Sequence, residues 1–310
     1  MNSGPARRGL KPALVAAAAV LLLVLVLVGS SCGQKTTTTP STGPKAITPV
    51  QTAPTTAPPQ TGPGGLPLHL NSAQIKKIDL SKNDFTFAMF GDNRGSTTVF
   101  PRLIDQVNAD NVLFAFDNGD LVDGASVGNY RLFLDQIAAS KKPFLVSGGN
   151  HDDSTGQLYT ALFGPAYYDF AIGNSMFIVL DDSNGTIDSA QLGWLKAELV
   201  KGQSYKYRFV VMHVPLYDPR FKGETTGHSL ASLSFAQMLN ALFDQQRVTL
   251  LMTSHIHGYY DGGWRQTRYI MTGGAGAPLY GADPVHYFNH YVRVHVTDAG
   301  VTYEPIHIQG

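Results

Sequence analysis

The stretch FTFAMFGD, residues 85 to 92, is a short apolar run that stops abruptly at a glycine and a carboxylate. The same arrangement recurs along the chain, and the later apolar runs are followed by GDLVD (119–123), GNHD (149–152), His213 and HIH (255–257). Fully apolar runs are typical of strands that are covered on both faces. Because ligands bind beyond the carboxyl ends of strands in open α/β sheets, the sequence predicts that these polar residues meet at one site.

The order of the apolar and periodic segments predicts the fold class. Six apolar runs look like strands: 85–90, 111–116, 143–147, 176–180, 207–212 and 248–254. Four segments with helical spacing lie between them: 97–107, 130–138, 189–200 and 235–243. Such alternation predicts an α/β sheet with helices outside it. Three later segments (264–272, 290–297 and 301–308) look like strands with little helix between them, and we expect them to form a second, mostly antiparallel sheet packed on the first.

The first 66 residues differ in composition from the rest. Arg7, Arg8 and Lys11 precede an apolar run that ends at Val28, which is the layout of a secretory signal. The single cysteine, Cys32, follows directly and cannot form an internal disulfide, so residues 1–32 resemble a bacterial lipoprotein signal. An uncleaved helical anchor is the alternative. Both interpretations place the rest of the chain outside the cytoplasm and anchored to a membrane.

Residues 33–66 are rich in Thr and Pro and lack periodic apolar residues, which predicts a disordered tether. Residues 67–310 then form the folded domain, long enough for a large core. The 23 Lys and Arg balance the 23 Asp and Glu, and no large basic cluster is present. Nucleic acid is therefore not expected as a main partner, because binding the phosphate backbone needs concentrated positive charge. The sequence gives no indication of the oligomeric state.

The polar residues after the strands suit a metal site. Carboxylates, an amide oxygen and imidazoles bind divalent manganese, iron or zinc, and the lack of thiolates argues against a purely structural zinc site. One carboxylate shared by two ions is the arrangement that two-metal centres use in phosphoester hydrolysis. Each motif alone could be an ordinary turn, but five motifs in order, each after an apolar run, favour one functional site.

The order GD, GDxxD, GNHD, H and HxH, between Phe85 and His257, resembles the calcineurin-like metallophosphoesterase family. The resemblance implies a four-layer αββα sandwich, with two β-sheets face to face and helices on both outer sides. It also implies two divalent ions, with Asp92 and His257 on the first, Asp120 bridging, and Asn150, His213 and His255 on the second. In this reading a metal-bound hydroxide attacks phosphorus, while His151, paired with Asp123, orients the phosphate and protonates the leaving oxygen.

Arg94 departs from the family pattern, which usually has a metal-binding histidine two residues after the first aspartate. An arginine stays protonated and cannot ligate, so the first ion lacks one expected ligand. We expect Arg94 to bind a phosphate oxygen through its planar guanidinium, and His228 to line the substrate cleft. The predicted function is hydrolysis of phosphomonoesters or phosphodiesters, as a phosphatase or phosphodiesterase. The alternative is a surface binding protein of the same fold with weak or no catalysis.

Overall fold

The computed structural model describes residues 61–221 and 227–309 of the 310-residue chain. The expected signal or anchor (1–32) and most of the expected tether (33–60) lie outside the described residues. Thr61, the first described residue, forms a β-bridge with Pro67. Leu66 is buried, with only 4% of its surface exposed. Within the described ranges, no helix combines the length and the apolar character needed to cross a bilayer.

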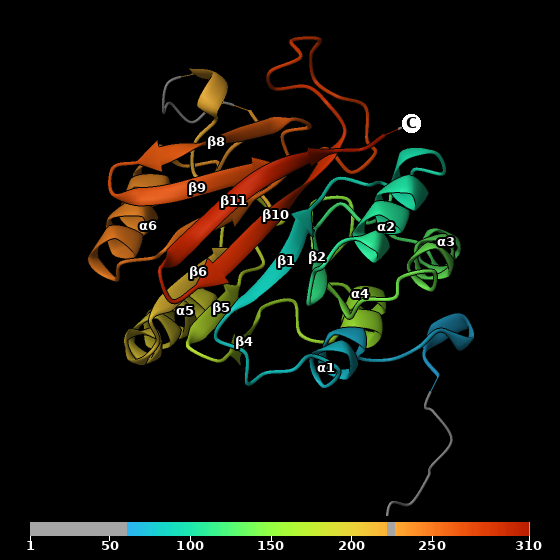
Figure 1. Ribbon diagram of the computed structural model, residues 1–310, viewed down its shortest axis with the longest axis horizontal. Coiled ribbons are helices and arrows are strands. Elements are labelled where there is room, and N and C mark those ends of the chain that lie inside the picture. The colour runs from blue at the N-terminus through green and yellow to red at the C-terminus, as the bar shows by residue number, and fades with distance from the viewer. Residues whose placement is uncertain (1–60, 222–226, 310) are drawn as a thin grey trace, which may run out of the picture. The chain divides into compact units, whose positions relative to one another are not determined.

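Two β-sheets form the centre of the fold (Figure 1). The first has the strand order β11-β10-β1-β2-β3, with β1 (Phe85–Phe90), β2 (Phe114–Asn118), β3 (Phe144–Ser147), β10 (His290–Thr297) and β11 (Gly300–His307). The second has the order β4-β5-β6-β7-β9-β8, with β4 (Tyr168–Ile172), β5 (Ser175–Val179), β6 (Tyr207–Val211), β7 (Leu250–Thr253), β8 (Tyr259–Trp264) and β9 (Thr267–Thr272). Strands β1, β2 and β3 are parallel, and so are β5, β6 and β7.

Apolar side chains fill the space between the sheets and explain why the strands are apolar throughout. Phe87 of β1 stacks on Phe114 of β2 at a centroid distance of 5.0 Å and meets Phe177 of the second sheet edge-on at 5.4 Å. Phe90, also on β1, packs instead in the cluster under the helices. Both faces of β1 are therefore covered, which favours a continuous apolar run over an alternating one.

Helices cover the outer face of each sheet (Figure 1). The helices on the first sheet are α2 (Val99–Ala109), α3 (Val127–Ile137) and α4 (Gln157–Phe163), and those on the second are α5 (Ser189–Lys201) and α6 (Leu233–Gln245). The short elements are α1 (Leu70–Ile75), which packs against β3, and the 3-10 turns η1 (Pro63–Gly65), η2 (Gly202–Ser204) and η3 (Pro219–Phe221). The expected four-layer αββα sandwich is confirmed.

The assignment of strands to sheets differs from the expectation. The six apolar runs divide between the two sheets, and the late strands do not form a sheet of their own. Strand β10 pairs antiparallel with β1, with Phe87 opposite Val294, and β9 pairs parallel with β7, with Met252 opposite Ile270. An edge strand exposes unpaired backbone groups that accept a further strand. The sheet that each late strand joins is determined by pairing with a strand that is distant in the sequence. Hydrophobic periodicity is a local pattern and does not predict such pairing.

Candidate metal centre

The carboxyl ends of parallel strands from both sheets converge on one site. The candidate ligands follow these strands: Asp92 after β1, Asp120 after β2, Asn150 after β3, His213 after β6, and His255 and His257 after β7. Two groups, Asp92–Asp120–His257 and Asp120–His213–His255, each bring one potential ligand atom per residue within 4.8 Å of the others. Asp120 belongs to both groups, as a carboxylate between two ions does.

A backbone carbonyl determines which ring nitrogen of His257 faces the site. His257 Nδ1 lies 2.7 Å from the carbonyl oxygen of Pro278, which can only accept, so Nδ1 carries the proton. In the neutral ring Nε2 then presents a lone pair, and it lies 3.4 Å from Asp92 Oδ1. That carboxylate oxygen is buried and has no hydrogen-bond partner among the described residues. Two acceptors facing each other in this way fit a cation bound between them.

His213 repeats the arrangement on the other side of Asp120. Its Nδ1 lies 2.8 Å from the carbonyl oxygen of Asn118, which leaves Nε2 with a lone pair in the neutral ring. His213 Nε2 lies 3.4 Å from Asp120 Oδ1 and 3.2 Å from Asn150 Oδ1. It also lies 3.3 Å from His255 Nδ1. A carboxylate, an amide oxygen and two imidazoles around one point are a suitable ligand set for a divalent transition metal.

Burial and mutual charge perturb the pKa values of these groups. Burial alone would raise the pKa of Asp92, but the neighbouring imidazoles of His257 and His213, when protonated, hold it well below its usual range. Burial alone would lower the pKa of His213, but the negative charges of Asp120 and Asp92 raise it to about 9. Burial, with the charge of His213, lowers the pKa of His255 to about 3. Perturbations of this size are typical of functional sites.

Backbone strain is concentrated at the same residues. Asp92, Asp120 and His255 have φ angles of 62°, 55° and 69°, in the left-handed region that non-glycine residues rarely adopt. Each such conformation costs on the order of 1–3 kcal/mol, so the surrounding structure must hold it in place. Gly119, with φ of 88°, has no room for a side chain, because a Cβ there would lie 2.7 Å from His213 Nδ1.

A buried carboxylate, Asp152, ties two of the motif loops together. It accepts hydrogen bonds from the backbone N–H groups of Leu121 at 3.0 Å, Val122 at 3.2 Å and Gly149 at 2.8 Å. Burial raises its pKa to about 7, with the charge of Asp120 as the next cause. The sequence analysis gave Asp152 no role, although it is the last residue of the GNHD motif.

Asp182 and Ser254 support the ligands in a similar way. Asp182 accepts a hydrogen bond of 2.8 Å from the backbone N–H of His213. The Ser254 hydroxyl donates to Asp92 Oδ2. Sequence reasoning missed Asp182, although it lies two residues after the apolar run 176–180 and so carries the same signal as the other strand ends.

His151 lies beside Asp123, as expected, but the two side chains are not hydrogen-bonded. His151 Nδ1 lies 3.9 Å from Asp123 Oδ1, which is too far for a hydrogen bond. Arg94 Nη2 donates to that oxygen instead. The backbone N–H of Arg94 donates to the carbonyl oxygen of Asp120 at 2.9 Å, and in the described part of the chain its other guanidinium N–H groups have no hydrogen-bond partner. The second ring nitrogen of His151 lies 3.9 Å from Asp120 Oδ2, so Arg94, Asp123 and His151 border the same side of the centre.

An aromatic wall, formed by Tyr280, His228 and Arg220, borders the other side. Tyr280 stacks on His257 at a centroid distance of 4.2 Å, and His228 lies 5.0 Å from the Tyr280 ring. The Arg220 guanidinium lies 5.6 Å from the same ring and makes two hydrogen bonds, of 2.9 and 2.6 Å, to buried Asp218. Sequence reasoning gave no role to Tyr280, although it ends the glycine-rich segment 272–280 that follows the last ligand strand.

Comparisons with known proteins give a family and a fold. The family model described as calcineurin-like phosphoesterase matches residues 85–259, more than half of the chain. A protein named "Probable cyclic nucleotide phosphodiesterase", from Fibrobacter succinogenes, is 33% identical over 92 residues, covering 27% of this chain and 35% of that protein. The chain spans about a third of the length of the curated relatives that it matches.

Two solved structures are similar in fold. GAP50, the anchor in the inner membrane complex of Plasmodium, has a TM-score of 0.54 at 16% identity, with 74% of this chain and 86% of that chain covered. Purple acid phosphatase PPD1 from yellow lupin (Lupinus luteus) has a TM-score of 0.53 at 16% identity, with 73% and 52% covered. At these identities the likeness shows the fold alone.

Proposed function

Because the chain belongs to the calcineurin-like phosphoesterase family, we propose that it is a metal-dependent hydrolase of small phosphoesters. The observation that carries the proposal is the pair of acceptor clusters that share Asp120. In each cluster a backbone carbonyl holds the proton on His Nδ1, so that Nε2 faces a carboxylate 3.4 Å away. This arrangement suits metal ions, because the neutral rings present lone pairs beside carboxylate oxygens.

The ligands divide between two ions. We assign Asp92, Asp120 and His257 to the first, and Asp120, Asn150, His213 and His255 to the second. Manganese, iron and zinc all suit these donors. Divalent ions held here would lower the pKa of an attacking water and offset the charge that develops on the phosphate.

Arg94 and His151 are the residues assigned to the phosphate and the leaving group. The guanidinium N–H groups of Arg94 that have no partner among the described residues can donate to a phosphate oxygen while Nη2 stays bound to Asp123. His151 is partly exposed, and its ring lies between Asp120 and Asp123, so it can donate a proton to the leaving oxygen. Asp123 then orients Arg94 rather than His151.

The aromatic wall supports a substrate with a planar group. Tyr280 is held against His257, and Arg220 is fixed by its two bonds to Asp218, so the wall is rigid. Aromatic and guanidinium faces stack on flat groups such as aryl rings and nucleobases. The name of the Fibrobacter relative supports a nucleotide as one member of this class.

The N-terminal segment supports export and tethering to a membrane. Its basic residues, its apolar run to Val28 and the cysteine at position 32 fit a lipoprotein signal. If Cys32 carries the lipid, Cys32→Ser moves the full chain from the membrane fraction to the soluble fraction. If the apolar run is an uncleaved anchor, the variant stays with the membrane.

One observation favours the alternative of a binding protein with weak catalysis. Arg94 stands where a further ligand of the first ion was expected. Against it, all six candidate ligands are present and brought together at the strand ends.

Hydrolysis assays separate the two functions. The full chain, purified and supplied with Mn²⁺, is expected to hydrolyse p-nitrophenyl phosphate or bis(p-nitrophenyl) phosphate. Asp120→Asn should reduce turnover by more than about 100-fold, because replacing even the supporting residues of a metal site costs about 10- to 100-fold. Asp105→Asn, at an exposed position on α2, is the matched control and should keep full activity. A chain that hydrolyses neither ester would favour the binding protein.

A further inference from the structure

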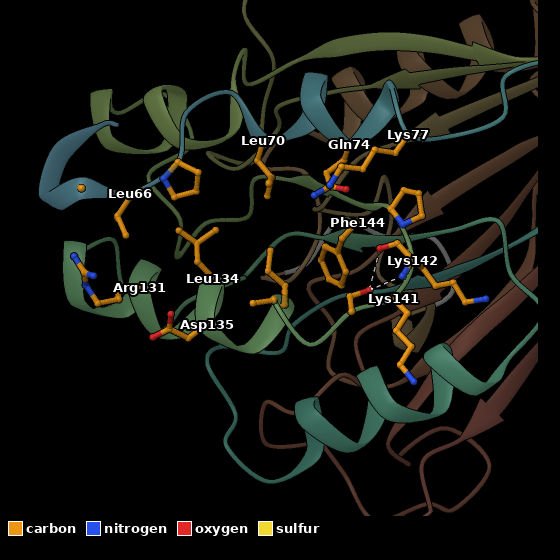
Figure 2. A pocket seen from close by; sticks show the side chains of 16 residues that line it. Leu66, Leu70, Gln74, Lys77, Arg131, Leu134, Asp135, Lys141, Lys142 and Phe144 are labelled. Carbon is orange, nitrogen blue, oxygen red and sulfur yellow. Dashed lines mark hydrogen bonds between the residues drawn. The ribbon is translucent and has the colours of Figure 1, made fainter. Parts of the chain in front are cut away.

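A groove lies at the amino end of β3, whereas the metal centre lies beyond the carboxyl ends of the strands. Its walls are the segment Gly65–Pro67, helix α1, the second half of α3 and the loop that leads into Phe144 of β3 (Figure 2). The cavity measures about 660 Å³, which is within the range of sites for small molecules. No residue of this groove belongs to the metal centre.

The floor of the groove is apolar. Its apolar lining includes Leu66, Leu70, Leu134, Ile137 and Phe144. Leu66, Ile137 and Phe144 are buried in the core under α3, while Leu70 and Leu134 are half-buried and line the open side. An apolar chain laid in this groove would contact Leu70 and Leu134 and lose part of its contact with water.

Positive charge gathers at one end of the groove. Figure 2 shows Lys77, Lys141 and Lys142 at that end, and Arg131 and Asp135 at the other. In residues 61–221 and 227–309, none of the three lysine ammonium groups has an ion-pair or hydrogen-bond partner. Arg131 and Asp135 carry opposite charges one helical turn apart, so the surplus positive charge lies at the lysine end.

The negative ends of the nearby helix dipoles do not neutralise the three lysine ammonium groups. Helices α1 and α3 both end beside the lysines, and each macrodipole is equivalent to about half an elementary charge. Together they offset about one of the three ammonium groups. The last carbonyls of α3 are already bound, because Leu134, Gln136 and Ile137 accept from the backbone N–H groups that follow.

The lysine loop and α1 are both held in place. Asn108 Oδ1 accepts from the backbone N–H of Lys141 at 2.6 Å, and the Ser140 hydroxyl bonds both the N–H and the carbonyl of Lys142, at 3.2 and 3.0 Å. On the other wall, the Asn71 side chain bonds both backbone groups of Val146 in β3, at 3.0 and 2.9 Å. The groove is therefore largely preformed, which lowers the cost of binding.

We propose that this groove binds an amphiphile with one anionic headgroup and one alkyl chain. The carboxylate or phosphate of the headgroup is bound by Lys77, Lys141 and Lys142, and the chain lies along Leu70 and Leu134 towards Leu66. A free inorganic anion would leave the apolar floor exposed, and a neutral detergent would leave the three ammonium groups unpaired. Fatty acids and the anionic lipids of a bilayer share this chemistry.

The test uses dodecanoate below its micelle concentration, measured by isothermal titration calorimetry on the full chain. Dodecanoate is not a phosphoester, so the result is independent of hydrolysis at the metal centre. Dodecyl maltoside carries the same chain without charge, and inorganic phosphate carries charge without a chain. We expect saturable binding of dodecanoate at one site per chain, much tighter than either control compound.

Two matched triple variants locate the binding. Replacing Lys77, Lys141 and Lys142 together with Gln should weaken dodecanoate binding on the order of a hundredfold. The control variant with Gln at Lys82, Lys196 and Lys206, all outside the groove, should bind like the wild type. Equal binding by the two triple variants would overturn the proposal, and so would equal binding of dodecanoate and dodecyl maltoside.

Two further measurements test the apolar floor and the source of the ligand. Leu134→Gln should weaken binding of dodecanoate and leave that of inorganic phosphate unchanged. Co-sedimentation with vesicles containing phosphatidylglycerol shows whether the groove also takes a lipid from a bilayer, in which case the groove variant sediments less than the control variant. If the groove variant and the control variant sediment equally but still differ in dodecanoate binding, the groove binds a free amphiphile rather than a lipid of the bilayer. A difference in sedimentation without one in dodecanoate binding would overturn the site and leave only a basic surface.

Discussion

Replacing Arg94 with alanine separates its part in the fold from its part in substrate binding. Arg94 pairs with Asp123, and the two side chains are 26% and 66% exposed. An exposed ion pair contributes about 0–1 kcal/mol to stability. The backbone φ of Arg94 is 44°, which is as costly for alanine as for arginine, so the substitution changes no backbone strain. We therefore expect urea unfolding of Arg94→Ala to stay within about 1 kcal/mol of the wild type.

Catalysis should change far more than stability. A hydrogen bond between charged groups contributes about 1.5–3 kcal/mol, which is about 10- to 150-fold at 1.36 kcal/mol per decade. Steady-state kinetics of Arg94→Ala with p-nitrophenyl phosphate should show that loss in kcat/KM, while its metal content stays that of the wild type because arginine is not a ligand. Arg94→Lys keeps the charge but lacks the planar guanidinium, so its kcat/KM should lie between those of the wild type and Arg94→Ala. Wild-type kcat/KM in Arg94→Ala, or loss of metal from it, would refute this reasoning.

Three further substitutions test other parts of the structure. The two oxygens of Asp152 accept from three backbone N–H groups, and Asp152→Asn replaces one of these oxygens with an NH2 donor. The variant should lower the free energy of unfolding by about 2 kcal/mol in urea, and an unchanged midpoint would contradict the positioning role of Asp152. Burial lowers the pKa of His290 to about 4 in the folded chain, from about 6.5 in the unfolded chain. The stability linked to its neutral ring is therefore present above pH 6.5 and is lost as the pH falls to 4, and the loss in free energy of unfolding is about 3 kcal/mol. Between pH 6.5 and 4, the free energy of unfolding of His290→Asn should fall by about 3 kcal/mol less than that of the wild type. Parallel plots of unfolding free energy against pH for the two proteins would show that His290 is not the titrating group. Tyr280→Leu should raise KM about 2- to 10-fold for an aryl phosphate but not for methyl phosphate, and equal changes for both esters would exclude stacking.

Much of the site could be predicted because its signal is local. Asp92, Asp120, His213 and His255 each come at the end of a buried apolar run, and the strand ends meet at one edge for geometric reasons. The calcineurin-like resemblance rested on the same motifs and was confirmed by the match to residues 85–259. Asp182 could have been found by the same reasoning, because it too follows an apolar run.

Other features depend on contacts between distant residues, which no local pattern encodes. The pairing of β10 with β1 joins segments more than 200 residues apart, and it places β10 and β11 in the first sheet, whereas β9 joins the second sheet beside β7. Arg94 and Asp123 come from different loops, and the hydrogen bond between them was not expected from the sequence. The groove beside α1 likewise needs two separate stretches, 65–77 and 131–144, to come together.

Metal content is the most direct test of the central claim that the strand ends form a two-metal centre. The full chain, equilibrated with excess Mn²⁺ and desalted, is analysed by mass spectrometry for metal per chain. We expect two ions in the wild type and in the Asp105→Asn control, and fewer than two in Asp120→Asn, which lacks the shared carboxylate. A wild-type chain that retains no metal, or an Asp120→Asn variant that retains two ions, would contradict the account.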